Sequence, residues 1–255
     1  MKLLIIRHGD PDYSIDSLTP NGKKEAEALA NYLASKRIDD CYVSPLGRAQ
    51  DTAAYTLRKI GKTAETLPWL TEFPAAVRFR ESPELFRAMP TPWDEEAQPF
   101  RIAWDILPSY LYPHEEYLDQ FDWRTSEVAK FSDLEEVYDG VANGLDALLA
   151  KYGYERNGNL YHVTKSSDKV VALFCHFGVE SVMLSHLLGI SPFAIWHGFM
   201  ALPSSVTVVN TEEREQGVAC FRVSQFGDLS HLALAGLEPS FAGRYCERFE
   251  DPTLH

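Results

Sequence analysis

The sequence lacks a long apolar run and has few cysteines. No apolar stretch in its 255 residues approaches the roughly 20 that a membrane span needs, so no membrane-spanning segment is predicted. The short apolar run at the N-terminus is followed at once by Arg7 and Asp10, which is not the pattern of a secretory signal. Cysteine occurs only at Cys41, Cys175, Cys220 and Cys246. Because this spacing fits neither a metal site nor a redox motif, we expect free thiols and a cytoplasmic location.

Basic residues are also fewer than acidic residues. The chain has 24 Lys and Arg residues against 37 Asp and Glu residues, which gives a formal net charge of −13. Nucleic acids and anionic membrane surfaces select basic proteins, so neither is expected as a partner. A site for a small anion on such a chain needs its own local cluster of positive groups.

Strand-like and helix-like patterns alternate along most of the chain, which predicts an α/β fold. Thr19-Pro20 and Ser44-Pro45 are each typical of an N-cap followed by a first-turn proline. Gly189 is expected to end a later helix, and the tail after His231 has no regular pattern. The predicted strands are 3–6, 41–43, 160–163, 170–174, 205–210 and 218–223, and the main predicted helices are 20–37, 45–60, 134–152 and 177–188.

The stretch from 74 to 132 departs from this alternation. It is rich in proline and lacks clear periodicity, but it is too aromatic for a disordered linker. The chain is long for one average domain and short for two. We therefore predict a single domain over 1–255, with 74–132 inserted into it as a packed lid. The aromatic residues of this lid are Phe79, Phe86, Trp93, Phe100, Trp104, Tyr110, Tyr112, Tyr117, Phe121 and Trp123.

Histidine and arginine occur where predicted strands end and helices begin. Arg7 and His8 follow the first strand, His176 follows a later one, and Arg48 lies in the first turn of a helix. Glu72 ends a short extended segment. In a parallel sheet the strand ends and the following helix starts share one edge, so we expect these side chains to meet there. Two arginines with two imidazoles describe a pocket for a dianionic phosphoryl group.

Six stretches, taken together, resemble the motifs of the histidine phosphatase superfamily, the phosphoglycerate-mutase-like group. They run in family order from residue 3 to 232. The resemblance implies a three-layer α/β/α sandwich with a mostly parallel central sheet. The matching stretches are Arg7-His8-Gly9, Leu18-Thr19-Pro20-Asn21-Gly22, the ten residues from Ser44 to Ala53, Leu70-Thr71-Glu72, His176-Phe177-Gly178 and Asp228-Leu229-Ser230-His231-Leu232.

The resemblance also implies a role for each residue of the pocket. His8 is the expected nucleophile, which takes the phosphoryl group as a phosphohistidine. Arg7, Arg48 and His176 hold the phosphoryl oxygens, while Glu72 protonates the leaving oxygen and later deprotonates the attacking water. Phosphoryl transfer depends mainly on positioning and charge neutralisation, which fixed arginines supply, so neither a metal nor another cofactor is predicted. The expected activity is that of a histidine acid phosphatase-like hydrolase acting on a small phosphomonoester.

The sequence departs from the family pattern at four places. Asp10 stands where Glu or Gln is common, an asparagine expected near Ser14 is missing, and Phe177 separates His176 from its glycine. Phe73-Pro74 replaces the usual stretch after Glu72. For Glu72 an ordinary solvated carboxylate is therefore the competing interpretation.

Three alternatives to a phosphatase follow from the residues. A mutase returns the phosphoryl group to a second hydroxyl, but the Trp- and Asn-containing stretch of the family's mutases is missing here. A non-hydrolytic module that binds phosphorylated ligands requires loss of the acid. A metal site from His8, Asp10, His176 and His197 lacks ligand spacing and would lie beside two arginines. The sequence predicts no oligomeric state.

Overall fold

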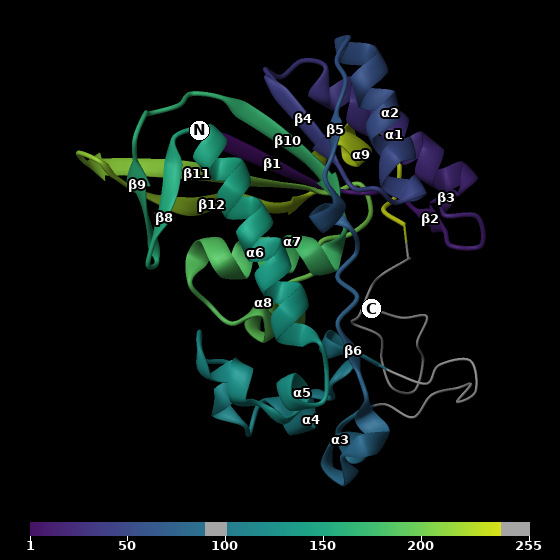
Figure 1. Cartoon of the computed structure of the whole chain (residues 1–255). Coiled ribbons are helices and arrows are strands. Elements are labelled where there is room, and N and C mark those ends of the chain that lie inside the picture. Colours follow the sequence, from purple (N-terminus) through teal and green to yellow (C-terminus); the bar gives the residue numbers. More distant parts are fainter. Residues whose placement is uncertain (90–100, 241–255) are drawn as a thin grey trace.

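A twisted eight-stranded sheet forms the centre of the molecule (Figure 1). The computed structural model describes residues 1–89 and 101–240. Within them the strand order is β5-β4-β10-β1-β11-β12-β9-β8. Its strands are β1 (Lys2–Arg7), β4 (Asp40–Val43), β5 (Glu65–Thr66), β8 (Tyr154–Asn157), β9 (Leu160–Val163), β10 (Val170–Cys175), β11 (Val206–Glu215) and β12 (Val218–Asp228).

The sheet is parallel on one side and antiparallel on the other. Strands β5, β4, β10 and β1 are paired in parallel, whereas β11, β12, β9 and β8 continue the sheet in antiparallel pairs. The parallel half brings the carboxyl ends of β1, β10 and β4 to one edge. The predicted α/β/α sandwich is confirmed, with a mixed sheet at its centre.

Helices cover both faces of the sheet. Helices α1 and α2 pack on one face, and α6 and α7 pack on the other (Figure 1). The helices are α1 (Pro20–Leu33), α2 (Gly47–Ile60), α3 (Pro83–Ala88), α4 (Pro108–Leu111), α5 (Glu127–Lys130), α6 (Leu134–Lys151), α7 (Phe177–Leu188), α8 (Pro192–Gly198) and α9 (Ser230–Ala235).

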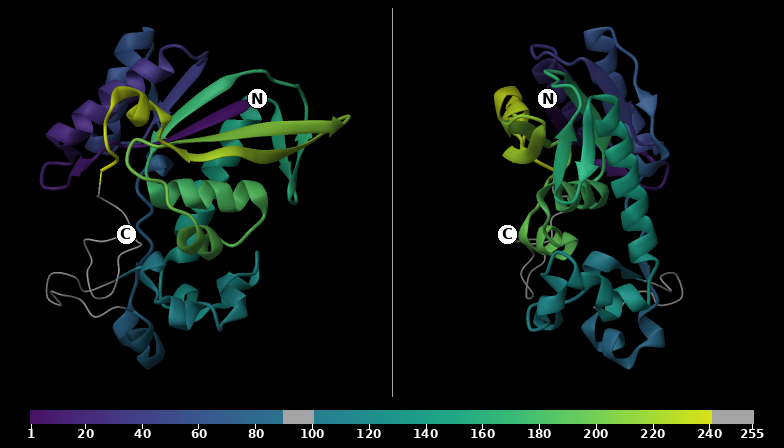
Figure 2. Two further views of the ribbon diagram at one scale, coloured as in Figure 1. Left: turned by 180° about the vertical axis from the view of Figure 1, so that it is seen from behind. Right: turned by 60° about the vertical axis from the view of Figure 1, so that its left-hand side comes forward.

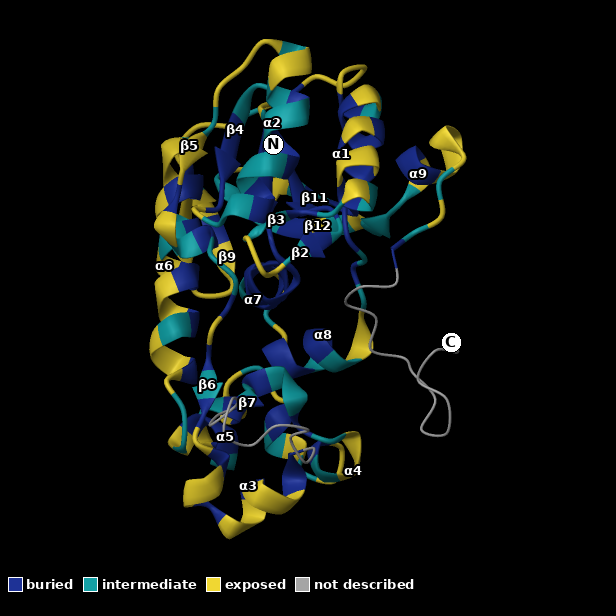
Figure 3. Ribbon diagram, turned by 90° about the vertical axis from the view of Figure 1, so that its right-hand side faces the viewer, coloured by how far each residue is buried: buried dark blue, intermediate teal, exposed yellow. Residues whose placement is uncertain are grey.

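Successive side chains of β1 point to alternate faces of the sheet, and each face is covered by its own layer of helices. Leu4 and Ile6 are buried against α1 and α2, while Leu3 and Ile5 join the larger core on the other face. Successive strand residues point to opposite faces, so a strand that is apolar throughout needs cover on both sides. Helix α7 is buried almost all round (Figure 3), because it packs against the sheet and against helices α6 and α8.

Most of the 74–132 stretch forms short helices and turns beyond α7 and α8, away from the sheet (Figure 2). Its only ladder pairs β6 (Ala76–Val77) with β7 (Arg101–Ile102) among the described residues. The buried rings of Phe79, Tyr117 and Trp123 belong to the same core cluster as α6 and α7. Trp93 and Phe100 lie outside the described residues.

Some local predictions were wrong. Helix α2 begins at Gly47 rather than at Ser44-Pro45, and the Ser44 hydroxyl bonds elsewhere. Strands β11 and β12 are longer than predicted, since their outer halves are polar and lack a buried pattern. The tail is not wholly irregular, because α9 packs its His231 and Leu232 toward α1. Among the described residues, no helix has the length and apolar content needed to cross a membrane.

Candidate active site

The structure brings the five predicted residues together at the edge where β1 and β10 end. Arg7 pairs with Cys175 at the end of the two strands, and the His8 backbone N–H donates to the Cys175 carbonyl at 3.0 Å. The ring centroids of His8 and His176 are 5.1 Å apart. This adjacency follows from the parallel register, which places the residue after each strand at the same level.

Hydrogen bonding fixes which nitrogen of His8 carries the proton. Nδ1 lies 2.7 Å from the carbonyl oxygen of Gly9. A carbonyl only accepts, so Nδ1 donates and Nε2 keeps its lone pair. The Arg48 Nε lies 3.4 Å from that Nε2. The unprotonated nitrogen of His8 therefore faces the positive end of Arg48.

The second histidine, His176, is hydrogen-bonded through Nε2 instead of Nδ1. His176 Nε2 lies 2.8 Å from the Ser44 hydroxyl, which also accepts a hydrogen bond from the Leu46 N–H at 3.2 Å. We assign the Ser44 hydroxyl as the donor to Nε2, because the ring proton then lies on Nδ1, the nitrogen that faces the Glu72 carboxyl. Nδ1 has no partner and lies 4.0 Å from Glu72 Oε2. His176 thus presents an N–H donor to the pocket. Sequence reasoning missed Ser44, because Ser-Pro was interpreted as a helix cap.

The guanidinium of Arg48 is oriented by a loop between β1 and α1. Asp16 accepts from Arg48 Nη1 at 2.6 Å and from the Gly47 N–H at 2.6 Å. Asp16 has a φ of 47°, in the left-handed region that Asp tolerates better than most residues. These bonds and the charge of Arg48 hold the pKa of Asp16 below its usual range despite partial burial. Nothing in the sequence pattern pointed to Asp16.

Arg7 is buried with part of its hydrogen-bonding capacity unused. Its Nη1 donates to the Ala201 carbonyl, and its Nε has no partner in the structure. The guanidinium carbon lies 5.7 Å from the centre of the Phe177 ring. Phe177, the residue that departs from the family pattern, therefore packs beside Arg7. A bound anion would satisfy the remaining donors of Arg7.

Glu72 reaches the first turn of α7. Its Oε1 accepts from the Phe73 N–H at 2.9 Å and from the Gly178 N–H at 3.0 Å. Its side chain is 29% exposed, and Oε2 lies toward His176. The competing interpretation, a solvated carboxylate away from the pocket, does not fit these contacts.

Burial dominates the ionisation of the cluster. It lowers the pKa values of His8 and His176 well below their usual range, and the neighbouring arginines push in the same direction. Burial also raises the pKa of Glu72, although Arg7 and Arg48 oppose it. The two imidazoles are thus neutral near pH 7, and the carboxyl favours its protonated form more than an exposed glutamate does.

Asp10 does not face the pocket. Its Oδ2 accepts from Thr19 at 2.6 Å, its Oδ1 accepts from Ser240, and its backbone N–H donates to Glu25 at 2.8 Å. Asp10 therefore ties the loop after His8 to the start of α1. Thr52 supports the same loop, since its hydroxyl accepts from the Gly9 N–H at 3.0 Å.

One arrangement of three residues has the spacing of a metal site. His8, Glu72 and His176 each offer a ligand atom, all within 4.8 Å of one another. The positive charges of Arg7 and Arg48 are close enough to lower the pKa values of His8 and His176. They would repel a dication, so an anion suits this pocket better. His197 and Asp10 are not part of the group.

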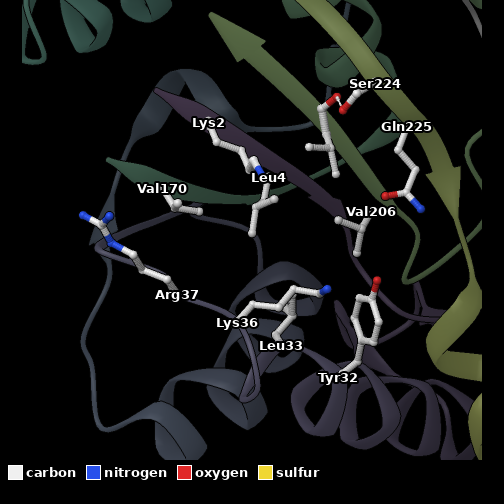
Figure 4. Close-up of a pocket in the computed structure, with 11 residues that line it drawn as sticks. Lys2, Leu4, Tyr32, Leu33, Lys36, Arg37, Val170, Val206, Ser224 and Gln225 are labelled. Carbon is white, nitrogen blue, oxygen red and sulfur yellow. Dashed lines mark hydrogen bonds between the residues drawn. The ribbon is translucent and has the colours of Figure 1, made fainter. Parts of the chain in front are cut away.

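A separate cavity of about 400 Å³ lies between the C-terminal end of α1 and the N-terminal half of β1 (Figure 4). Tyr32, Lys36 and Lys2 stand around it, and Leu4 and Val206 form part of its lining. None of the five predicted site residues lines it.

The sequence profile of the histidine phosphatase superfamily (branch 1) matches residues 3–130. The chain belongs to this superfamily. Comparison with curated protein sequences gives no match.

Solved structures resemble the whole fold. A mutant phosphoserine phosphatase from Entamoeba histolytica, in complex with phosphoserine, is 17% identical; 91% of this chain and 98% of that chain are covered, with a TM-score of 0.56. A mycobacterial glucosyl-3-phosphoglycerate phosphatase with inorganic phosphate is also 17% identical, with 90% and 98% covered and a TM-score of 0.57. At such identities the likeness concerns the fold.

Proposed function

We propose that this protein hydrolyses a small phosphomonoester without a metal, through a phosphohistidine formed on His8. The observation that carries the proposal is the bond from His8 Nδ1 to the Gly9 carbonyl, which leaves Nε2 as a nucleophile beside Arg48. A neutral imidazole near pH 7 is competent for this attack.

In the first step Nε2 of His8 attacks phosphorus, and the bond from phosphorus to the leaving oxygen breaks. Glu72 gives its proton to that oxygen. In the second step the Glu72 carboxylate takes a proton from water, whose oxygen attacks phosphorus while the P–N bond returns its electrons to His8. Arg7, Arg48 and the Nδ1–H of His176 stabilise the phosphoryl oxygens throughout.

Membership of the superfamily and the phosphatase activities named for the similar structures support a phosphatase over a binding module. The position of Glu72 also argues against a lost acid. Mutase activity differs only in the acceptor, so supplying an alcohol and measuring transfer against hydrolysis separates the two. We favour water as the acceptor. We also propose that the protein is cytoplasmic and that residues 74–132 act as a lid.

The test is turnover of p-nitrophenyl phosphate in EDTA by the wild type, by His8→Ala and by His162→Ala. His162 is an exposed histidine on β9 and serves as a matched control. We expect turnover by the wild type and the control, and loss of about 10⁴-fold or more in His8→Ala. Activity that requires added metal, or that survives loss of His8, contradicts the proposal.

A further inference from the structure

The 74–132 stretch places one tryptophan ring against the acid. A Cβ atom added to Gly178 would lie 2.5 Å from the ring of Trp104 and 2.7 Å from Glu72 Oε1. The ring and the carboxyl oxygen therefore meet over the same backbone position. Only glycine at 178 lets both approach the first turn of α7, where the Gly178 N–H bonds Glu72.

The ring of Trp104 packs against Trp196, which is itself packed against Phe73. The centroids of Trp104 and Trp196 are 5.7 Å apart, and Phe73 lies 5.3 Å from Trp196 on another side. The Trp196 indole N–H donates to the carbonyl of Gly178 at 3.4 Å. The residue after Glu72, the first turn of α7 and Trp104 are thus joined through Trp196.

The backbone makes the same connection. The Ala103 N–H donates to the carbonyl of Ala75 at 3.1 Å, next to the pairing of Ala76 with Ile102. Asp105 closes the turn around Trp104 by accepting from the Ile102 N–H at 2.9 Å. These bonds hold the backbone on both sides of Trp104 close to the residues that follow Glu72.

We propose that Trp104 is a positioning residue for Glu72, which covers Oε1 from water and keeps Oε2 directed at the leaving oxygen. This inference rests on the proposed function. It assigns to the 74–132 stretch a definite task in the acid step: proton donation depends on a residue outside the sheet edge.

The charges around Glu72 set the direction of the expected change. His8 and His176 lie beside Glu72 at the sheet edge, Arg7 and Arg48 favour its ionised form, and Glu180 disfavours that form when it is itself ionised. Burial raises the pKa of the nearby Cys175 thiol, which stays neutral. Against this fixed background, loss of the indole admits water and weakens the burial effect. The carboxyl then loses its proton at lower pH, so the basic limb of kcat/KM moves to lower pH.

The experiment compares pH profiles of kcat/KM for Trp104→Ala, Trp104→Phe and the wild type, with an alkyl phosphate and with p-nitrophenyl phosphate. For Trp104→Ala we expect the basic limb to move down by roughly 0.5–1 pH unit and the alkyl phosphate to lose about 10-fold at neutral pH. The p-nitrophenyl ester, whose leaving group needs little protonation, should lose much less. Trp104→Phe should restore most of both.

Two further variants keep the test decisive. Trp123→Phe alters another tryptophan of the stretch, one that packs on Tyr138, and should leave the profile unchanged. Trp104→Leu also removes the ring but keeps an apolar side chain in its place. It should show the same shift of the basic limb, and it can be measured if Trp104→Ala does not fold. An unmoved limb, or an equal loss with both esters, overturns this inference alone. A wild type without His8-dependent turnover overturns the proposed function, and this inference with it.

Discussion

The sheet edge and the 74–132 stretch meet at Glu72, and they fix their side chains by different means. At the edge, hydrogen bonds orient the side chains: the Gly9 carbonyl orients His8, the Ser44 hydroxyl orients His176, and Asp16 orients Arg48. On the other side, the contacts beside Glu72 are packed rings, above all Trp104 and Trp196. His8 is thus oriented by hydrogen bonds, and Glu72 is held partly by the packing of neighbouring rings.

Substitutions in the two regions should therefore impair different parts of the reaction. Changes at the edge should impair transfer for every substrate, because they alter the phosphoryl pocket itself. Changes on the Glu72 side should lower kcat/KM to an extent that depends on the leaving group, because they impair the proton transfer to the leaving oxygen.

The largest of these effects is expected for Arg48→Ala. The change removes the donor beside His8 Nε2 and leaves Asp16 without its partner. We expect kcat/KM to fall about 10²–10³-fold for activated and unactivated esters alike. Arg58→Ala, at the exposed end of the same helix, is the control. A loss confined to poor leaving groups would contradict the assignment of Arg48 to the phosphoryl pocket.

Glu72→Gln tests the other side of the comparison. An amide has nearly the shape of the carboxyl but donates no acid proton, so loss should scale with the pKa of the leaving group. We expect kcat/KM, which reports only the steps up to release of the alcohol, to fall about 10²-fold or more for alkyl phosphates and only a few-fold for p-nitrophenyl phosphate. In the wild type, kcat/KM should fall as pH rises through the raised pKa of Glu72, and this limb should vanish in the variant. A uniform loss would remove Glu72 from the acid role.

Ser44→Ala should weaken the edge without removing any charged group. His176 loses the hydroxyl that fixes its tautomer, so its Nδ1–H is presented only part of the time. We expect about a 10-fold loss of kcat/KM, close to the free energy of one hydrogen bond, with every ester. Ser185→Ala breaks a comparable buried contact, with Tyr138, away from the site and should leave kcat/KM intact. An unchanged Ser44→Ala enzyme would show that Ser44 does not set the tautomer.

The smallest effect concerns stability alone. Burial raises the pKa of Glu180 on α7 from 4.5 to about 7, so folding favours its neutral form. That contribution is fully present below about pH 4.5 and is lost as pH rises toward about 7. Glu180→Gln cannot ionise and should gain on the order of 2 kcal/mol over the wild type at about pH 8, and little at about pH 4.5. Thermal melts at both pH values, with the exposed Glu155→Gln as control, check this. A pH-independent difference would contradict it.

The same contrast explains how much was predictable from the sequence. His8 and His176 were placed correctly, because apolar runs predict the buried strands and the parallel arrangement fixes where their ends meet. Arg7 and Arg48 followed from the same reasoning. The position of Glu72 at the end of an extended segment placed it in the same group, the family motifs implied its role as the acid, and the structure puts it beside His176.

The residues that were missed act through contacts distant in the sequence. Ser44 bonds a histidine 132 residues away, and Asp16 bonds an arginine 32 residues away. Trp104 meets Glu72 only because α7 has a glycine between them. Periodicity reports which face of an element is buried, but it does not report which side chain arrives from another element. In the 74–132 stretch, where prolines and short turns interrupt periodicity, even the elements themselves were not predicted.

The central claim is that His8 carries the phosphoryl group between the two steps. The direct measurement is to quench the wild-type enzyme with alkali during turnover in EDTA and to map phosphorylated peptides by mass spectrometry. Phosphohistidine survives alkali, and the account predicts one phosphoryl group on the peptide that contains His8, absent when the enzyme is His8→Ala. Steady turnover with no phosphoryl group on that peptide, or with the group on another residue, would contradict the account.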